Sequence, residues 1–537
     1  MDNLFRLAGF LPFILIVFLN AFIDLGHKIL IQNTVFKIYD GQTQIILTAI
    51  VNGLILLPFV LLFTPAGYLS DRHPKPRVMQ VSAAVAVGLT LLITLAYYQG
   101  WFRFAFAMTF LLAVQSAFYS PAKYGYIKEL TGKERLTTAN AIVQAVTIVA
   151  ILLGIFIFSV FFEQALTGVS YDSPAQLLQA IAPVGWVLVA CAGLGFLLTL
   201  RLPATGTGAA DLSFDWTRYG KGRYLRDNLH TILGNRSIWL SIVGLSAFWG
   251  ISQVVLAAFP AFAKETLAEN NTVIIQGIMA SSGIGIMLGS LLAGRASKHH
   301  IETGLIPLGA LGIVTALFAL PQLTSRGGLI MDFLLLGTAG GVFIVPLNAL
   351  IQFHARDAQL GTVLAGNNWV QNVVMLSFLG LTVAFALSGT SSLGLFHLLT
   401  LTALAGAFYT VYQLPQSLVR YVIARLFAST NRIEVLGFDN LPGTGGVLML
   451  GNHISWLDWA MIQIACPRPV RFVMHRGIYQ RWYLRWFLDF FGVIPIAAGQ
   501  SKEALQKINE LLRAGEVVCL FPEGAISRNG QLGEFKH

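Results

Sequence analysis

The chain has 537 residues, of which 55% are hydrophobic and only 11% are charged. This composition excludes a soluble globular domain and a disordered chain, and it indicates a protein that lies mostly in a membrane. The formal net charge of +10 would suit a nucleic-acid-binding protein, but the basic residues recur in alternate short links rather than in one patch, so we expect no nucleic acid partner.

Apolar runs of membrane-spanning length follow one another from near the N-terminus to about residue 413. Each is long enough to cross a bilayer as a helix, and short polar links bound it. The first run has no small-residue cleavage site, so we expect a retained helix rather than a signal peptide. The twelve expected spans are 9–30, 44–69, 77–98, 101–122, 137–162, 177–200, 237–262, 272–294, 301–320, 328–351, 361–388 and 392–413.

Basic residues mark every second link, whereas the intervening links hold few of them. By the positive-inside rule, this asymmetry places both termini and the central link in the cytoplasm. The three cysteines, Cys191, Cys466 and Cys519, are too few and too scattered for a disulfide framework, and we expect no metal site. The marked links hold Arg72, Lys75 and Arg77; Lys123, Lys128, Lys133 and Arg135; Arg218, Lys221, Arg223, Arg226 and Arg236; and Arg295 and Lys298.

Two groups of six spans flank a polar link over residues 203–236, so we expect six-helix bundles over 1–202 and 237–414. The link after the second span reads Gly-Tyr-Leu-Ser-Asp71-Arg72 and continues with Lys75 and Arg77. It resembles the cytoplasmic signature of the major facilitator superfamily. The resemblance implies an all-α transporter with two facing bundles, and Asp71 and Arg72 can lock them on one side. An ordinary charged loop is the alternative.

Asp24 is the clearest ionisable residue inside a span. A carboxylate at membrane depth normally faces a cavity or a partner, so we expect Asp24 to line the transport path. An ion pair with Lys28, one helical turn away, is the structural alternative. Neutral polar side chains in other spans, such as Gln115 and Gln276, suggest an amphiphilic cavity, although each alone is more often a contact between helices.

Residues at the exit of the fourth span indicate one branch of the superfamily. Tyr119-Ser-Pro-Ala-Lys-Tyr-Gly125, together with Asn20-Ala-Phe22 before Asp24, is similar to the lysophospholipid transporter branch of the superfamily. This resemblance implies transport of lysophospholipid, chiefly lysophosphatidylethanolamine, across the bacterial inner membrane. The chain departs from that branch at Leu25, where the branch has asparagine. It also has Gln253 in the seventh span, where the resemblance leads us to expect a basic residue.

From Pro415 onward the composition changes to that of an α/β domain, expected over 415–537. Apolar residues alternating with Arg420 and Arg425 predict an amphipathic helix suited to the membrane surface. An aromatic and basic run over 479–487 predicts a second interfacial anchor. Strands are expected at 432–436, 446–450, 470–474 and 517–520, a turn at 442–443 and a helix at 501–514.

His453 and Asp458 lie five positions apart just after the expected strand 446–450. A histidine can act as general base when a carboxylate holds its ring in the right tautomer. A loop histidine and an unrelated aspartate are the alternative. The stretch Phe521-Pro-Glu523-Gly524 follows the strand expected at 517–520.

Together these stretches resemble the NHxxxxD and FPEG blocks of the glycerolipid acyltransferases. The resemblance implies that His453 and Asp458 are catalytic and that Asn452, Glu523 and Gly524 bind substrate. It implies no bound cofactor, but acyl-acyl carrier protein or acyl-coenzyme A as co-substrate. Residues 492–496 resemble the second block of that family.

The family usually has arginines at the positions of Ile526 and of Ala497 or Ala498. Such arginines would suit a phosphate monoester, so their absence favours a phosphodiester headgroup, although Arg528 or Arg476 could compensate. A fourth block is expected after FPEG, and only ten residues follow Ser527. We therefore expect a longer polypeptide that completes the acyltransferase and can add an acyl-activating ligase.

The sequence thus predicts a membrane fusion that flips lysophospholipid inward and re-acylates it. One alternative is a facilitator of another small solute with a degenerate acyltransferase as docking module. Another is a membrane-anchored lysophosphatidic acid acyltransferase of de novo synthesis. The intact His453, Asp458 and Glu523 count against the first, and the full set of spans with Asp71 and Arg72 counts against the second.

Overall fold

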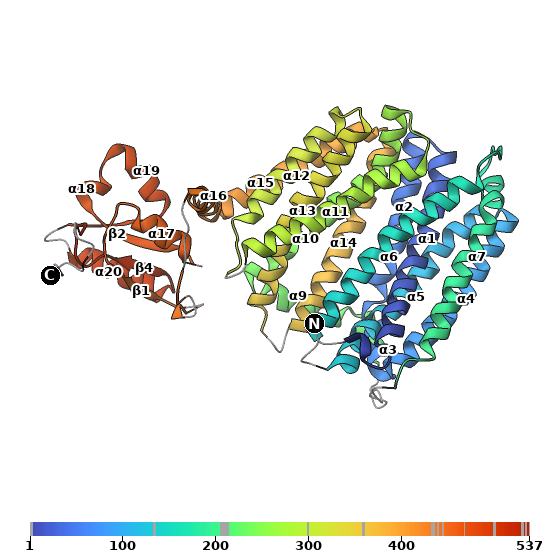
Figure 1. Ribbon diagram of the computed structural model, residues 1–537, viewed down its shortest axis with the longest axis horizontal. Coiled ribbons are helices and arrows are strands. Elements are labelled where there is room, and N and C mark those ends of the chain that lie inside the picture. Colours follow the sequence, from blue (N-terminus) through green and yellow to red (C-terminus); the bar gives the residue numbers. More distant parts are fainter. Residues whose placement is uncertain are drawn as a thin grey trace. The chain divides into compact units, whose positions relative to one another are not determined.

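Long apolar helices dominate the computed structural model, and twelve are long and apolar enough to cross a membrane (Figure 1). The predicted number of spans is therefore confirmed. The structure describes residues 4–132, 136–204, 214–297, 300–356, 360–430, 435–437, 440–442, 445–466, 468–497, 501–527, 531 and 534–535. Lys133, Arg135, Lys298, Ala498, Arg528 and most of the strand expected at 432–436 lie outside these residues.

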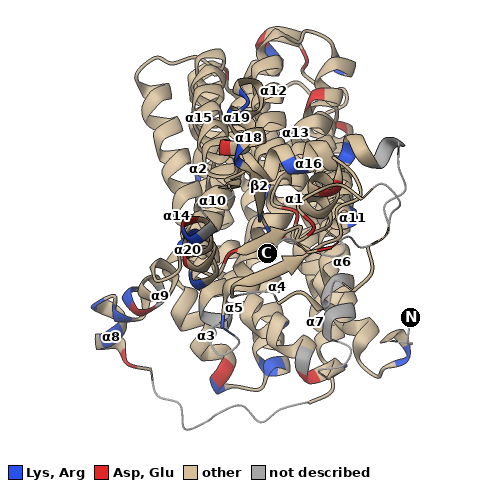
Figure 2. Ribbon diagram, turned by 90° about the vertical axis from the view of Figure 1, so that its left-hand side faces the viewer, with Lys and Arg blue, Asp and Glu red and all other residues tan. Residues whose placement is uncertain are grey.

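The helices of the first part of the chain alternate with short links, and charged residues gather at helix ends and in the links (Figure 2). Several helices begin where a side chain caps the first free amides: the Asn235 side-chain oxygen accepts the amides of Ser237 and Ile238 at 3.0 and 3.2 Å. The helices are α1 Phe10–Ile38, α2 Gly41–Leu61, α3 Phe63–Arg72, α4 Lys75–Gln99, α5 Phe102–Thr131, α6 Leu136–Ala165, α7 Pro174–Thr199, α8 Trp216–Gly220, α9 Arg223–Leu233, α10 Arg236–Leu267, α11 Thr272–Ala296, α12 Leu305–Ala319, α13 Arg326–His354, α14 Leu360–Leu387, α15 Ser392–Gln413 and α16 Pro415–Thr430.

Several helix boundaries differ from the prediction, among them the ends of α5 and α10, which continue to Thr131 and Leu267 rather than to residues 122 and 262. The first helix continues to Ile38 rather than residue 30, because its polar residues are paired between helices: Asn33 donates to Ser159 at 3.2 Å and Gln32 to Asn52 at 3.0 Å. A fall in hydropathy therefore does not end this helix. The second span was expected as one helix over 44–69, but it is divided into α2 and α3.

Pro65 explains the division of the second span. A helix would bond the Leu61 carbonyl to the amide of residue 65, and proline has no amide hydrogen. The freed carbonyl accepts a hydrogen bond from the Tyr219 hydroxyl of α8 instead. The central link, predicted only as polar, thus contains helices α8 and α9 and stabilises this break.

The chain divides into two compact units, and the first comprises residues 1–288, 312–340 and 347–404. In this unit α1 packs on α6, and α4 packs on α5 and α7, around an apolar core that includes Tyr97 and Phe158. Helices of the first six spans meet those of the second six where α2 packs on α10 and α14. Small side chains, Ala49 and Ala257, let these helices approach closely beside Leu379.

The second unit comprises residues 289–311, 341–346 and 405–537 and contains a parallel four-stranded sheet. Its strands are β1 Val447–Leu450, β2 Val470–His475, β3 Ile494–Ile496 and β4 Val517–Leu520, in the order β1-β4-β2-β3. Helices α17 Asp458–Ala465, α18 Arg476–Tyr479, α19 Trp482–Phe490 and α20 Ser501–Arg513 connect them. Three predicted strands and the helix at 501–514 are thus confirmed to within one residue.

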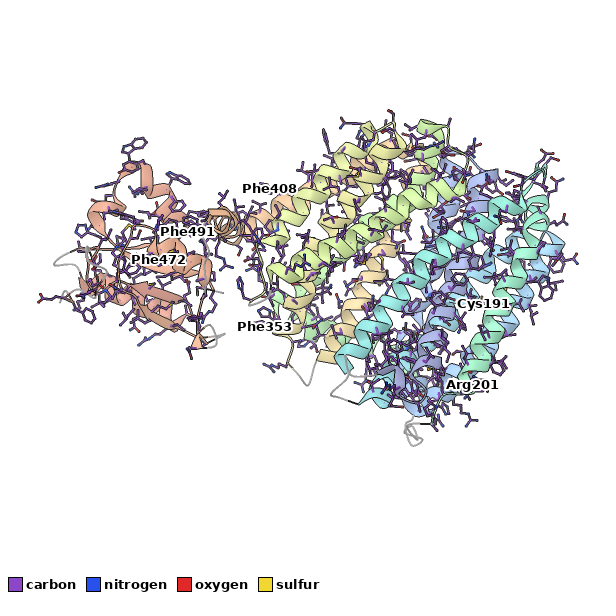
Figure 3. All side chains as sticks on the ribbon, in the orientation of Figure 1. Cys191, Arg201, Phe353, Phe408, Phe472 and Phe491 are labelled. Atoms are coloured by element: carbon purple, nitrogen blue, oxygen red, sulfur yellow. The ribbon has the colours of Figure 1, made fainter. Side chains whose placement is uncertain are left out.

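An apolar core fills the space between this sheet and its helices. Phe472 of β2 and Phe491 after α19 belong to it and are labelled in Figure 3. Gly492 follows with φ of 62°, and a Cβ there would lie 2.3 Å from the Arg471 guanidinium. Only glycine suits this position, because Arg471 is held by Glu516 at 2.6 Å and by the Phe491 carbonyl at 3.1 Å.

Helix α16 is fixed on two sides within the second unit. Arg420 is buried, and its guanidinium lies 3.6 Å from the Glu302 carboxylate and donates to the Cys466 carbonyl at 3.3 Å. Glu302 also contacts His300 at 3.1 Å and accepts the Gly304 amide at 3.2 Å. We predicted a surface-lying amphipathic helix, and Arg420 instead joins the link between α11 and α12 to the end of α17.

The contact between α16 and the α11–α12 link is close-packed. Thr303 donates to the Ser417 hydroxyl at 2.9 Å, and a Cβ on Gly304 would lie 2.4 Å from the Ser417 carbonyl oxygen. Burial alone would raise the pKa of Glu302, but His300, Arg420 and the Gly304 amide together hold it below its usual range. Glu302 is therefore charged at neutral pH and pairs with Arg420.

Candidate functional site

The two motifs found in the sequence meet at one edge of the sheet. Strand β1 pairs in parallel with β4, with Leu450 opposite Leu520. Gly451 and Phe521 therefore leave the sheet at neighbouring carboxyl ends, where open α/β sheets place their ligands. The Ser527 amide donates to the His453 carbonyl at 2.7 Å and ties the second motif to the first.

His453 and Asp458 form the predicted pair. The His453 Nδ1 lies 2.8 Å from Asp458 Oδ2, and the two side chains are 23% and 15% exposed. A carboxylate oxygen can only accept, so Nδ1 carries the proton, and in the neutral ring this leaves the lone pair on Nε2. The alternative of an unrelated loop histidine and aspartate is inconsistent with this hydrogen bond.

A tight loop holds the Asp458 carboxylate in place. Its Oδ2 also accepts the amides of Ile454 and Ser455 at 2.7 and 2.9 Å, and Asp458 begins helix α17. Burial alone would raise the pKa of Asp458, but these amides and the His453 ring together hold it below its usual range. Asp458 is therefore ionised and can stabilise a charged imidazole at neutral pH.

The second motif adds a ring and a carboxylate to the site. Phe521 stacks on the His453 ring with centroids 4.5 Å apart and fixes its plane, a role that we did not predict. Glu523 is buried, and its Oε1 accepts the His453 amide at 3.4 Å. Its Oε2 is buried with no hydrogen-bond partner among the described residues. A buried carboxylate oxygen in this state suits a donor from a substrate.

Gly524 turns the chain after Glu523 with φ of 62°, which requires glycine. The Gly524 amide is not available to a substrate, because it donates to the Phe521 carbonyl at 3.1 Å. The next two amides, of Ala525 and Ile526, have no partner within the described part of the chain. Asn452 is half-buried at the exit of β1, and Arg476 begins α18 on the surface.

An apolar cavity of about 110 Å³ lies in the same unit, between α17, α19 and β2. Its lining includes Trp459, Phe487 and Trp456, which lies in the loop between His453 and Asp458. Ile454, Trp456 and Leu457 expose 51%, 60% and 49% of their surface, so the loop between His453 and Asp458 presents apolar side chains outward. Such a surface suits a lipid substrate.

The first unit contains the candidate transport residue Asp24, on α1. Its carboxylate accepts hydrogen bonds from Asn20 at 3.1 Å and from Ser116 of α5. Gln115 donates to Asn20 at 3.4 Å and extends this network. No ion pair joins Asp24 to Lys28 in the described residues. Ser116 was not predicted, because a serine inside an apolar run gives little signal.

Asp71 and Arg72 lie at the end of α3 but do not pair with each other among the described residues. Asp71 is 70% exposed and lies 3.9 Å from Lys75, whereas Arg72 donates to the Tyr68 hydroxyl at 2.5 Å. Lys75 lies 3.4 Å from Glu129 of α5. The charges of this signature are therefore organised within the first six spans.

A polar clamp joins the first and second six spans at the opposite ends of these helices. We define it by Lys37, Asp40, Glu163, Lys264 and Thr272. Glu163 accepts the Thr272 amide and hydroxyl at 2.6 and 2.8 Å and lies 3.0 Å from Lys37, and Lys264 lies 2.6 Å from Asp40.

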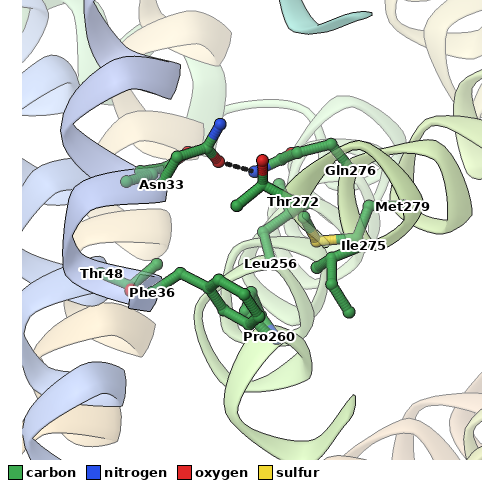
Figure 4. A pocket seen from close by; sticks show the side chains of 10 residues that line it. Asn33, Phe36, Thr48, Leu256, Pro260, Thr272, Ile275, Gln276 and Met279 are labelled. Atoms are coloured by element: carbon green, nitrogen blue, oxygen red, sulfur yellow. Dashed lines mark hydrogen bonds between the residues drawn. The ribbon is translucent and has the colours of Figure 1, made fainter. Parts of the chain in front are cut away.

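The hydrogen bond from Gln276 to Asn33, at 3.2 Å, lies beside the clamp (Figure 4). The side that carries the clamp is therefore closed in this structure. The sequence contains a signal for the clamp, because Lys37 and Lys264 are among the few basic residues near links that hold little charge.

Comparison with known families gives two matches along the chain. Residues 13–379 match the family model described as Major Facilitator Superfamily, and residues 432–537 match that described as Acyltransferase. The first match spans more than half of the chain, and the second contains the whole sheet with His453, Asp458 and Glu523.

Individual relatives agree with the first match. The chain is 31% identical over 385 residues to a protein named lysophospholipid transporter of Klebsiella pneumoniae, covering 70% of this chain and 87% of that one. It is 29% identical over 351 residues to the lysophospholipid transporter of Serratia proteamaculans, covering 64% and 80%.

Solved structures show the same fold. A POT family transporter has a TM-score of 0.58 at 12% identity over 76% of this chain and 96% of that chain. A bacterial homologue of the lysosomal transporter Spinster has a TM-score of 0.52 at 13% identity over 81% of this chain and 100% of that chain.

Proposed function

Because the chain belongs to the major facilitator superfamily and carries an acyltransferase domain after it, we propose that it moves a lysophospholipid across a membrane and re-acylates it. The names of the relatives support the transported class, since they are lysophospholipid transporters at 29–31% identity. In this proposal, residues 1–202 and 237–414 form the transporter, 203–236 is its cytoplasmic link, and 415–537 is the enzyme.

The hydrogen bond of 2.8 Å between His453 Nδ1 and Asp458 Oδ2 carries the enzymatic half of the proposal. With Nδ1 held, Nε2 takes the proton from a glycerol hydroxyl of the lysophospholipid. The oxygen attacks the carbonyl carbon of an acyl thioester, the carbon–sulfur bond breaks, and the imidazolium returns the proton to the leaving thiolate. Asp458 stabilises the imidazolium in between, and no acyl-enzyme forms.

The remaining residues of the site bind and orient. Glu523 Oε2 has no partner among the described residues and accepts a hydrogen bond from the acceptor lipid. Amides of the turn after Gly524 stabilise the oxyanion that develops on the thioester carbonyl. The apolar loop over 454–457 and the neighbouring cavity receive hydrocarbon, and Asn452, next to His453, contacts the substrate. The acyl donor is acyl carrier protein or coenzyme A in thioester linkage.

We infer the headgroup of the substrate from the absence of two arginines from the motifs. Ile526 and Ala497 stand where arginines would clamp a phosphate monoester. A phosphodiester such as lysophosphatidylethanolamine carries less negative charge and needs no such clamp. The substrate is therefore a lysophospholipid for remodelling rather than lysophosphatidic acid for de novo synthesis.

The transport half rests on Asp24 and on the clamp. Both termini and the basic links lie in the cytoplasm of a bacterial cell by the positive-inside rule, so the clamp closes the outer side. The lipid then reaches the Asn20–Asp24–Ser116 network from the inner side. Re-acylation on the same polypeptide follows at high effective concentration.

Reconstitution tests both halves at once. Labelled lysophosphatidylethanolamine is added outside proteoliposomes that enclose an acyl thioester, and wild type is compared with His453→Ala. Wild type should form diacyl lipid, whereas His453→Ala should accumulate internal lysolipid and acylate it about 10²–10⁴-fold more slowly. If neither protein moves the lysolipid, the transporter carries another solute and the proposal fails.

A further inference from the structure

A lateral groove of the first unit lies between α3, α4 and α5 and shares only Gln115 with the described residues of the two sites above. Its volume is about 530 Å³, and its lining is almost entirely apolar. Two basic residues, His73 and Arg77, border it at the end where α4 begins. The apolar lining is formed by Leu69, Val78, Val81, Val85, Leu89, Leu111, Val114 and Phe118.

The groove faces the hydrocarbon around the protein rather than its core. Val81, Val85 and Leu111 expose 59%, 47% and 40% of their surface. The break at Pro65 makes α3 a separate helix, and the space around Gly67 on α3 is open, with nothing within 4 Å of a Cβ placed there. Helix α3 therefore borders the groove without filling it.

Arg77 is the unusual cation of this region. Its neighbour Lys75 is held by Glu129 at 3.4 Å and by the Ser70 carbonyl at 3.1 Å. By contrast, the side chains of Arg77 and His73 make no ion pair or hydrogen bond with any described residue. An unpaired guanidinium at the mouth of an apolar groove suits a phosphate group, which it can bind through two parallel hydrogen bonds.

The dimensions of the groove match one leaflet of a bilayer. From Arg77 to Leu89, α4 rises about 18 Å, slightly more than half of the roughly 30 Å hydrocarbon core. The cation thus lies at the surface and the apolar lining extends toward the midplane. A groove of about 530 Å³ along this length of α4 suits one acyl chain rather than two.

We propose that this groove binds a single-chain phospholipid, with its phosphate on Arg77 and its acyl chain along α4 and α5. The buried Gln115 lies both in the lining and in the hydrogen-bonded network of Asp24, so the groove adjoins the candidate transport path. The groove is then a lateral port between that path and the leaflet at the α3–α4 link. This inference rests on the proposed function for the identity of the lipid.

Photo-crosslinking of the reconstituted full protein tests the port. The probe is lysophosphatidylethanolamine with a diazirine in its acyl chain, and labelled peptides are mapped. Labelling should concentrate on residues 78–89 and 111–118. Arg77→Gln should raise the half-saturating probe concentration about tenfold, because a charge-assisted hydrogen bond is lost. Val85→Trp should abolish labelling of these peptides by filling the groove.

Two matched variants serve as controls. Arg103→Gln removes an exposed arginine at the opposite end of α5, and Leu194→Trp adds a tryptophan on α7, where Leu194 is 51% exposed. Neither should change the labelling. Even labelling of all lipid-facing helices, or no effect of Arg77→Gln, would overturn the port. Equal competition by diacyl phosphatidylethanolamine would overturn a single-chain ligand.

Uptake and acylation measured on the same vesicles separate the two proposals. If uptake occurs and Arg77→Gln does not change the labelling, only the proposal of a lateral port is wrong. If labelling depends on Arg77 but no lysolipid is moved or acylated, the proposed function is wrong, and the groove is a lipid site of a transporter for another solute.

Discussion

At the scale of single residues, the most reliable prediction was the contact between His453 and Asp458, which lie only five positions apart in the sequence. A loop of four residues between His453 and Asp458 forces their side chains together, and the structure joins them at 2.8 Å. The contact of Glu523 with the His453 amide depends on the pairing of β1 with β4 across about seventy residues, and only family resemblance suggested it. Phe521 belongs to the motif, but nothing in the sequence predicted that its ring would stack on His453.

We expect Asp458→Asn to slow acyl transfer by as much as about 10⁴-fold, because the amide no longer fixes the tautomer or balances the imidazolium. The pKa of Asp458 is lowered in the folded protein, so its carboxylate favours folding above its ordinary pKa. That contribution is lost only as the pH falls through the lowered value. The defect should therefore persist across neutral and alkaline pH in a measured rate profile.

Asp489→Asn is the matched control for this loss. It removes an aspartate of the same unit, on α19, that bonds to Tyr479 away from His453. A similar loss in both variants would show that Asp458 acts only through folding.

We expect Asp24→Asn to reduce lysolipid uptake at least tenfold while leaving acyl transfer to lysolipid already inside unchanged. The asparagine amide has the shape of the carboxylate but lacks the negative charge that accepts the hydrogen bonds of Asn20 and Ser116. Uptake and acylation are measured separately in proteoliposomes. Unchanged uptake by a folded Asp24→Asn protein would remove Asp24 from the transport path.

At the scale of elements, hydropathy located every span, whereas contacts made far along the chain set the details. The break between α2 and α3 could have been predicted from Pro65, but its stabilisation by Tyr219 could not, because the tyrosine lies more than 150 residues later. The clamp likewise assembles residues of α1, α6, α10 and α11 whose spacing in the sequence has no period.

We expect Glu163→Gln to favour opening at the clamp by about tenfold or more, because a charged acceptor for Thr272 and Lys37 is lost. Spin labels on Thr43→Cys and Thr266→Cys, both exposed at this end, report the distance between the two sets of spans. Glu265→Gln, which loses a bond to Ser392 within the second set, is the control and should leave the distances unchanged. Equal distances in all three proteins would show that the clamp does not hold this side closed.

At the scale of the whole molecule, the boundary of the second unit does not coincide with the change of composition at Pro415. The unit also includes residues 289–311, because Glu302 and Gly304 pack against α16. The change in composition at Pro415 contains no sign of this pairing, which joins residues more than a hundred positions apart.

We expect Arg420→Met to destabilise the second unit by about 3–5 kcal/mol, because it leaves the buried Glu302 without its guanidinium. Heat inactivation of acyl transfer measures this effect, and Glu302→Gln in the same chain should recover part of it. Arg425→Met on the same helix removes an exposed arginine whose hydrogen bond among the described residues goes to Tyr421, and it should be nearly neutral. Equal effects of the two arginine variants would contradict a specific role of Arg420.

The ion pair of Arg420 with Glu302 also sets an order of events during protein synthesis. Arg420 is translated about 120 residues after Glu302, which at about 5–20 residues per second is a delay of roughly 6–24 s. Until then, the buried carboxylate has only His300 and the Gly304 amide as partners among the residues already made. We therefore expect Glu302 to gain its guanidinium partner only after the last spans have been made, when the ribosome has delivered α16.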